Sequence, residues 1–140
     1  MVILLILMLC FAGCSVDHMD KICAPIPHYG ETCEYGEDLT IAPAEIADLM
    51  DCLFEQYALI GYDIEPIFQE TRVIWMDEIH LGHCQSPACR GYCVGPHIVW
   101  CGTEWGLPVL EHELTHLIWW NLTGDPYANH DWPVQVGRCS

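Results

Sequence analysis

The sequence predicts a small α+β domain in which a backing helix and a short mixed sheet pack on a second, buried helix, with disulfides as staples. Apolar residues at helical spacing in residues 42–57 indicate the first helix, and a nearly all-apolar segment at 107–122 indicates the second. Short runs of β-branched and aromatic residues between them indicate strands. Ten cysteines in 140 residues point to an oxidising compartment or to metal binding.

The first helix is expected at Ala42–Tyr57, where both ends carry recognisable signals. Thr40 can cap its N-terminus, Pro43 suits its first turn and Gly61 ends it. Its apolar residues recur at steps of three and four and form a stripe for the core: Ile46, Leu49, Met50, Leu53, Phe54 and Tyr57.

Strands are expected at Arg72–Met76 and His97–Cys101, because both runs are short and rich in Val, Ile and Trp. Tyr62–Phe68 is a third candidate, which Pro66 would confine to a sheet edge since proline has no N–H to donate. The Cys- and Gly-rich segment Asp77–Pro96 is expected to form a stapled loop.

The second helix is expected at Leu107–Leu122, with Pro108 in its first turn and Gly124 as its stop. Its residues are apolar nearly all round the helix. A helix of this kind is buried on all sides, so we expect it at the centre of the domain.

Within this apolar helix, the run His112-Glu113-Leu114-Thr115-His116 contains three ionisable side chains. Burying them without partners would be costly, and a bound cation would offset that cost. Imidazoles four residues apart lie on one helix face and can reach one ion. The alternative is an ordinary helix whose histidines have other partners. The pattern favours Zn²⁺ held by His112 and His116.

A catalytic zinc site needs a third protein ligand, and the chain after the helix offers few. The candidates are Asp125, His130 and Asp131. We expect His130, because imidazole is the commoner ligand and the loop can return toward His116. Asp125 is the second choice, and Asp131 could instead orient His130 through its other ring nitrogen.

The H-E-x-x-H run resembles the motif of the zincin metallopeptidases, and the order of helix, strands and motif helix is similar over Ala42–His130. Trp119 and Leu122 stand where the metzincin branch has its Gly and third His, and no Glu follows Glu113 as in the gluzincin branch. The resemblance is therefore to the clan. It implies a metallopeptidase that cleaves a peptide or protein substrate with a zinc-activated water. It also implies Glu113 as general base and Tyr127 as oxyanion stabiliser.

Residues 1–13 are expected to be a signal peptide. Met1–Phe11 is an uncharged apolar run, too short to cross a bilayer but long enough for the apolar core of a signal. Ala12-Gly13-Cys14 resembles the end of a bacterial lipoprotein signal, which implies a lipid on Cys14. The alternative is a plain secretory signal with Cys14 unmodified. We expect export and a lipid anchor in the bacterial cell envelope, in the periplasm or at the cell surface, with the outer membrane as the first expectation.

The cysteines left after Cys10 is removed and Cys14 is lipidated are an even eight, and we expect them in disulfides. They are Cys23, Cys33, Cys52, Cys84, Cys89, Cys93, Cys101 and Cys139. The sequence does not choose among their pairings. A structural zinc site in Cys84–Cys101 is the alternative, but its spacing is wider than the usual C-x2-C pairs.

The exported chain is expected to have two parts. Residues 14–40 would be an irregular N-terminal arm, most clearly over Asp17–Glu37, pinned to the body by Cys23 and Cys33. Residues 41–140 would be the catalytic domain, with its tail tied down by Cys139.

Charge limits the partners. With 4 Lys plus Arg against 20 Asp plus Glu, the net charge is -16, which argues against nucleic acid and against anionic lipid surfaces. We expect a monomer acting on a peptide. The alternative function is a non-enzymatic, disulfide-rich surface lipoprotein with a structural zinc ion or no metal.

Overall fold

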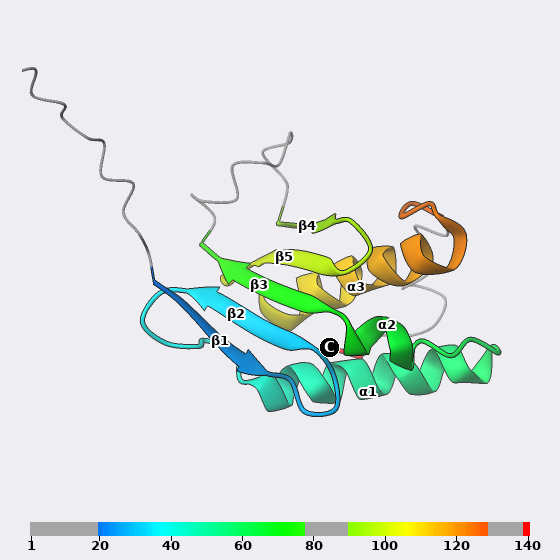
Figure 1. Cartoon of the computed structure of the whole chain (residues 1–140), viewed down its shortest axis with the longest axis horizontal. Coiled ribbons are helices and arrows are strands. Elements are labelled where there is room, and N and C mark those ends of the chain that lie inside the picture. Colours follow the sequence, from blue (N-terminus) through cyan, green and yellow to red (C-terminus); the bar gives the residue numbers. More distant parts are fainter. Residues whose placement is uncertain (1–19, 78–89, 129–138) are drawn as a thin grey trace, which may run out of the picture.

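The computed structural model describes residues 20–77, 90–128 and 139–140 (Figure 1). Within them the chain forms three helices and a five-stranded sheet, so the predicted α+β class is confirmed. The strands are β1 (Lys21–Pro25), β2 (Glu31–Tyr35), β3 (Arg72–Met76), β4 (Gly91–Val94) and β5 (Ile98–Gly102). The helices are α1 (Pro43–Leu59), α2 (Glu65–Gln69) and α3 (Gly106–Thr123).

The sheet is mixed and runs in the order β1-β2-β3-β5-β4. Its three central strands are parallel, while β1 and β4 pair antiparallel with their single neighbours and form the edges. Parallel strands need crossover connections, and α1 with α2 supplies the one between β2 and β3. At the edge of the sheet next to α3, the last strand is the short antiparallel β4.

One face of the sheet carries both long helices (Figure 1). Val73 and Trp75 of β3 and Val99 and Cys101 of β5 are buried in one cluster with apolar residues of α1 and α3. These positions alternate along their strands, as expected for side chains on a single face. The buried centre of α3, Leu110–Trp119, confirms the prediction of a largely buried helix.

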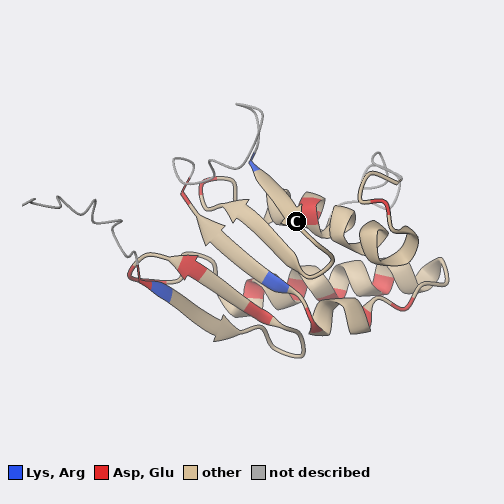
Figure 2. Cartoon of the chain, turned by 45° about the horizontal axis from the view of Figure 1, so that its top comes forward, with Lys and Arg blue, Asp and Glu red and all other residues tan. Residues whose placement is uncertain are grey.

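Charge is distributed unevenly over these elements (Figure 2). The exposed face of α1 carries Glu45, Asp48, Asp51 and Glu55, and the helix has no Lys or Arg. In the described part of the chain, the basic residues Lys21, Arg72 and Arg90 lie on or beside strands (Figure 2).

The N-terminus of α1 differs from the prediction. Ala42, not Thr40, is the N-cap, and the Glu45 carboxylate accepts the Ala42 N–H at 3.1 Å. The Thr40 N–H and hydroxyl instead donate to Glu34 of β2, at 2.5 and 2.6 Å. Thr40 thus ties the start of α1 to the sheet. Pro43 in the first turn is confirmed, and Gly61 follows the helix end with a φ of 92°.

Three predictions about short segments were wrong. The expected irregular stretch Asp17–Glu37 contains β1 and β2, which join the same sheet as β3. The candidate strand Tyr62–Phe68 overlaps α2, because Pro66 lies in the first helical turn, where proline is favoured. The expected loop Asp77–Pro96 contains β4, whose four residues, Gly-Tyr-Cys-Val, are too short a run to stand out in a Cys- and Gly-rich segment.

Two disulfides are confirmed in the described residues. Cys23 and Cys33 are register partners in the β1–β2 hairpin, so they close the hairpin rather than pin an arm to the body. Cys52–Cys139 ties the tail to α1, as predicted for Cys139.

The expectation of a disulfide is wrong for Cys93 and Cys101, which are free thiols. The β4–β5 register places Cys93 opposite Val99 and Cys101 opposite Gly91, so the two thiols are diagonal neighbours rather than direct partners. Cys84 and Cys89 lie outside the described residues.

The β1–β2 turn approaches the end of α2 so closely that only glycine fits at position 30. A Cβ on Gly30 would lie 1.8 Å from the Thr71 carbonyl oxygen. We expect Gly30→Ala to lower the free energy of unfolding by about 2–3 kcal/mol, the usual cost of overpacking, measured by urea denaturation.

Gly95→Ala is the matched control, because a Cβ there meets no atom within 4 Å and only its φ of 69° is unfavourable. It should cost about 1 kcal/mol. Equal losses for the two variants would contradict this interpretation of Gly30.

Candidate metal centre

The two histidines of α3 converge on one point. Their Nε2 atoms lie 3.0 Å apart, and the rings meet edge to face at 87° with centroids 4.6 Å apart. Two imidazole ligands of a tetrahedral zinc ion have their nitrogens about 3.3 Å apart, given Zn–N distances near 2.0–2.1 Å. The observed separation of the His112 and His116 nitrogens fits such a pair.

The other ring nitrogen of His116 is held by the chain that follows α3. His116 is 9% exposed, and its Nδ1 lies 2.6 Å from the Pro126 carbonyl oxygen. A carbonyl only accepts hydrogen bonds, so Nδ1 carries the proton and donates it. In the neutral ring, Nε2 therefore presents a lone pair toward His112, the tautomer that a metal ligand requires.

The Glu113 side chain of α3 lies against the edge strand β4. Glu113 is 7% exposed, and a Cβ added to Gly91 would lie 2.8 Å from the Glu113 Cγ. The Cys93 thiol donates to the Glu113 carbonyl oxygen at 3.1 Å. Burial raises the pKa of the Glu113 carboxyl to about 7. This carboxyl can therefore take or release a proton near neutral pH.

The two free thiols, Cys93 and Cys101, lie on the neighbouring strands β4 and β5. Burial, and then the nearby Glu113 carboxylate, raises the pKa of both thiols. Among the described residues, neither thiol forms a group of three close ligand atoms with the two histidines.

Tyr127 lies beside the histidine pair. The residue is 71% exposed, and its ring packs edge to face on His116, with centroids 5.4 Å apart. The Tyr127 N–H donates to the Asp125 carboxylate at 2.9 Å, so Asp125 shapes this turn. His130 and Asp131, like Cys14, lie outside the described residues.

A third ligand is not found among the described residues. Within them, one group of three candidate ligand side chains has all ligand atoms within 4.8 Å: Cys23, Glu31 and Cys33. Its sulfurs are joined in a disulfide, so they are not thiolate ligands. Asp125 does not form such a group with the two histidines.

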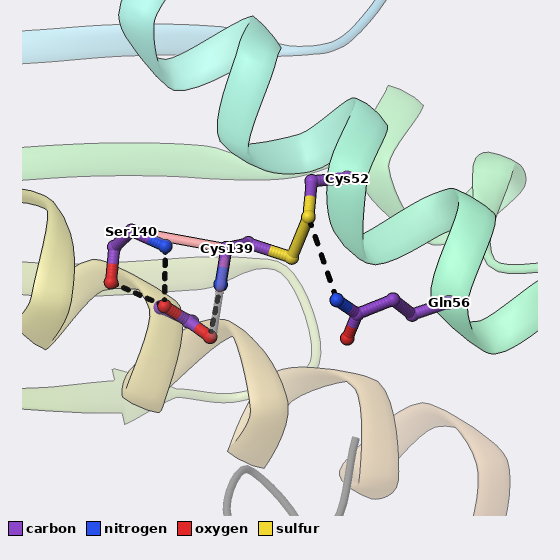
Figure 3. The surroundings of a disulfide bond; sticks show 5 residues. Cys52, Gln56, Cys139 and Ser140 are labelled. Atoms are coloured by element: carbon purple, nitrogen blue, oxygen red, sulfur yellow. Dashed lines mark hydrogen bonds between the residues drawn. A yellow bond between two sulfur atoms is a disulfide. The ribbon is translucent and has the colours of Figure 1, made fainter. Parts of the chain in front are cut away.

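Glu111, which the sequence analysis did not single out, holds the C-terminal tail (Figure 3). Glu111 is 4% exposed, and its carboxylate accepts the N–H groups of Cys139 and Ser140, both at 2.9 Å, and the Ser140 hydroxyl. The disulfide to Cys52 lies beside these bonds. The signal in the sequence was the same as for Glu113, an acidic residue in an otherwise apolar helix.

No protein-family model matches the chain, and no curated protein or solved structure is significantly similar to it. Within the described residues, no helix has both the length and the apolar character needed to cross a bilayer.

The metal-free protein should lose stability between about pH 4.5 and pH 7 because of Glu113. Folded Glu113 keeps its proton up to about pH 7, while the unfolded chain releases it near 4.5, so the folded state binds more protons in this window. Stability then falls as pH rises, by about 3 kcal/mol for this group. Urea denaturation of wild type and Glu113→Gln, with a chelator present, measures the difference. If the free energy of unfolding changed with pH in parallel in the two proteins, the pH dependence would not come from Glu113.

Proposed function

We propose that the protein is a zinc-dependent metallopeptidase, with His112 and His116 as two of the zinc ligands and Glu113 as general base. The observation that carries the proposal is the convergence of the two Nε2 atoms at 3.0 Å, with the His116 Nδ1 proton committed to the Pro126 carbonyl. This is the arrangement of a histidine pair whose lone pairs can face one cation.

Zinc, Glu113 and Tyr127 would have separate roles in peptide hydrolysis. Zinc, when bound, would supply a Lewis acid that polarises the scissile carbonyl and acidifies a water molecule. Glu113 would accept the proton of that water and deliver it to the leaving amine, a role suited to a carboxyl that titrates near neutral pH. Tyr127, packed on His116, would stabilise the oxyanion.

His130 is the proposed third ligand. The chain on either side of it is attached to α3, at the His116–Pro126 contact and at the Glu111 contacts with Cys139 and Ser140. These two attachments to the helix that carries the histidine pair support the choice of His130. Asp125 is the second choice, and Asp131 would orient His130.

The edge strand β4 supports a peptide as the substrate. Among the described strands it pairs only with β5 and lies at the border of the sheet. An extended peptide can add to such an edge by main-chain hydrogen bonds. Because Gly91 of β4 contacts Glu113, a peptide bound there would pass close to the general base.

Export, with a lipid on Cys14 that anchors the protein in the cell envelope, is part of the proposal. The Cys23–Cys33 and Cys52–Cys139 disulfides support an oxidising compartment.

Zinc content and peptide cleavage together test the proposal. We expect one zinc ion per purified protein, loss of zinc in His112→Ala and His116→Ala, and loss of cleavage when a chelator removes the metal. Glu113→Gln should keep the zinc and lower kcat by at least about 100-fold, the usual contribution of general base catalysis. Elemental analysis and a fluorogenic peptide library provide the two measurements.

The third ligand is decided by comparing His130→Ala with Asp125→Ala. Only the ligand's variant should lose zinc affinity. A protein that binds no zinc, or that cleaves peptides equally well as Glu113→Gln, would contradict the peptidase. Zinc binding without any cleavage would favour a non-enzymatic protein with structural zinc.

Gly91 should control the position of Glu113. In Gly91→Ala, the new Cβ would lie 2.8 Å from the Glu113 Cγ and 2.9 Å from the Trp100 carbonyl oxygen, so the Glu113 side chain has to move. We expect kcat to fall about tenfold or more, since small displacements of a general base are costly, while zinc content is unchanged. Val94→Ala, at an exposed position of the same strand, is the control and should leave kcat within about twofold. Equal kcat values for the two variants would argue against this role of Gly91.

A further inference from the structure

We propose that Cys23, Cys33 and Glu31 form a second metal site, which is closed while the two cysteines are joined in a disulfide and opens when a small thiol reduces that bond. The ligand of the open site is a thiophilic divalent cation such as Zn²⁺. This inference does not rest on the proposed peptidase, because the three residues lie on β1 and β2, whereas the histidine pair lies on α3.

The three side chains lie together on one face of the β1–β2 hairpin. Cys23 and Cys33 are direct register partners with their Cα atoms 4.0 Å apart, and Glu31 precedes Cys33 by two residues. Residues two apart on a strand point to the same face. The two sulfurs and a Glu31 carboxylate oxygen all lie within 4.8 Å of one another. Two thiolates and a carboxylate, with water in the fourth position, are ligands that zinc accepts.

The sheet keeps this arrangement in place when the disulfide is reduced. β2 pairs with β1 on one side and with β3 on the other, and the Thr32 hydroxyl of β2 accepts the Trp75 Nε1–H of β3 at 3.0 Å. Two sulfurs bound at 2.3 Å to one tetrahedral ion lie about 3.8 Å apart. Direct cross-strand partners can reach this separation by side-chain rotation, so the backbone does not have to move.

The other disulfide of the described residues does not offer such a site. Cys52–Cys139 joins α1 to the end of the chain, across 87 residues of sequence. In the part of the chain that the structure describes, no third ligand side chain forms a close group with these two cysteines. The proposed site is therefore specific to the hairpin disulfide.

Arg72 of β3 orients the Glu31 carboxylate and balances its charge. The two residues are register partners, and the Arg72 Nε forms an ion pair with the Glu31 Oε1. The carboxylate can bind an ion through its other oxygen, and ligating carboxylates are commonly held by such a second partner. Two thiolates and Glu31 carry three negative charges, and a divalent ion with Arg72 carries three positive ones, so the occupied site is neutral.

A cavity gives the reductant and the ion access to this site. Cys23 is exposed, whereas Cys33 is 0% exposed. A cavity of about 470 Å³ lies beside them, and its lining includes Cys23, Glu31, Thr71 and Arg72. This space can admit a small thiol and can hold the water that completes the coordination of the ion.

Opening of the site is a thiol–disulfide exchange. A small thiol attacks the exposed Cys23 sulfur, the S–S bond breaks, and Cys33 takes up a proton. A second thiol displaces the first from Cys23, so two small thiols are oxidised to one disulfide while the two cysteines are reduced. Cation binding then displaces the two cysteine thiol protons.

Cd²⁺ is the probe for this site, because its bonds to thiolates have an ultraviolet charge-transfer band. The parent protein is the full chain with His112→Ala and His116→Ala, so that the histidine pair does not contribute. After reduction with dithiothreitol and anaerobic desalting, the parent should bind one Cd²⁺ more than the same protein with Cys23→Ser, as counted by elemental analysis. Both reduced proteins lack the disulfide, so its loss does not explain a difference. The oxidised parent should lack this ion.

Variants of the other residues test the ligand set. Glu31→Gln should weaken this Cd²⁺ binding by about tenfold or more, and Arg72→Gln by about tenfold. The matched control is Cys52→Ser combined with Cys139→Ser, which removes the thiols of the other disulfide and should keep the ion. Oxidised glutathione should release one Cd²⁺ from the loaded parent and restore Cys23–Cys33, which mass spectrometry of its peptides detects.

Equal Cd²⁺ content of the reduced parent and its Cys23→Ser variant overturns the proposal, as does an ion that stays bound after re-oxidation. Either result leaves the peptidase intact, because the parent lacks the histidine pair. In turn, failure of the peptidase does not affect the Cd²⁺ comparison.

Discussion

The burial of α3 is the constraint on which the rest of the structure depends. This helix places ionisable side chains in an apolar interior, where each one needs a partner or has to lose its charge. The structure meets the need differently in each case. Glu111 accepts backbone N–H groups of the tail, His116 donates to the Pro126 carbonyl, and Glu113 has a raised pKa that favours its neutral form.

These hydrogen bonds attach the chain that follows α3 back to α3. The turn after Gly124 brings the Pro126 carbonyl to His116, and the chain end returns to Glu111 and is locked to α1 by Cys52–Cys139. The same contacts that satisfy buried polar groups therefore fix Pro126 and the last two residues of the chain relative to the core.

The long periodic segments could be predicted from the sequence, and the short ones could not. The helices α1 and α3 and the strands β3 and β5 have strong patterns and turn signals, which local sequence alone carries. In contrast, β1, β2 and β4 carry fewer β-branched and aromatic residues than β3 and β5. The helix α2 was missed because Pro66 fits both a sheet edge and the first turn of a helix. Within the site, helical spacing predicted that the two histidines meet. The contact with Pro126, the approach of Gly91 to Glu113 and the role of Glu111 depend on tertiary packing, so a linear pattern could not show them.

The contact between the two histidines also explains why a cation would suit this site. The His116 Nδ1–H donates to a carbonyl, so in the neutral ring Nε2 carries only a lone pair, and a second lone pair 3.0 Å away would repel it. A proton on one of the two Nε2 atoms, or a metal ion between them, removes this repulsion. Zinc would therefore displace a proton from an arrangement that already exists, and its binding would strengthen as pH rises. The free energy needed to bring these two ligands together is supplied by folding rather than by metal binding.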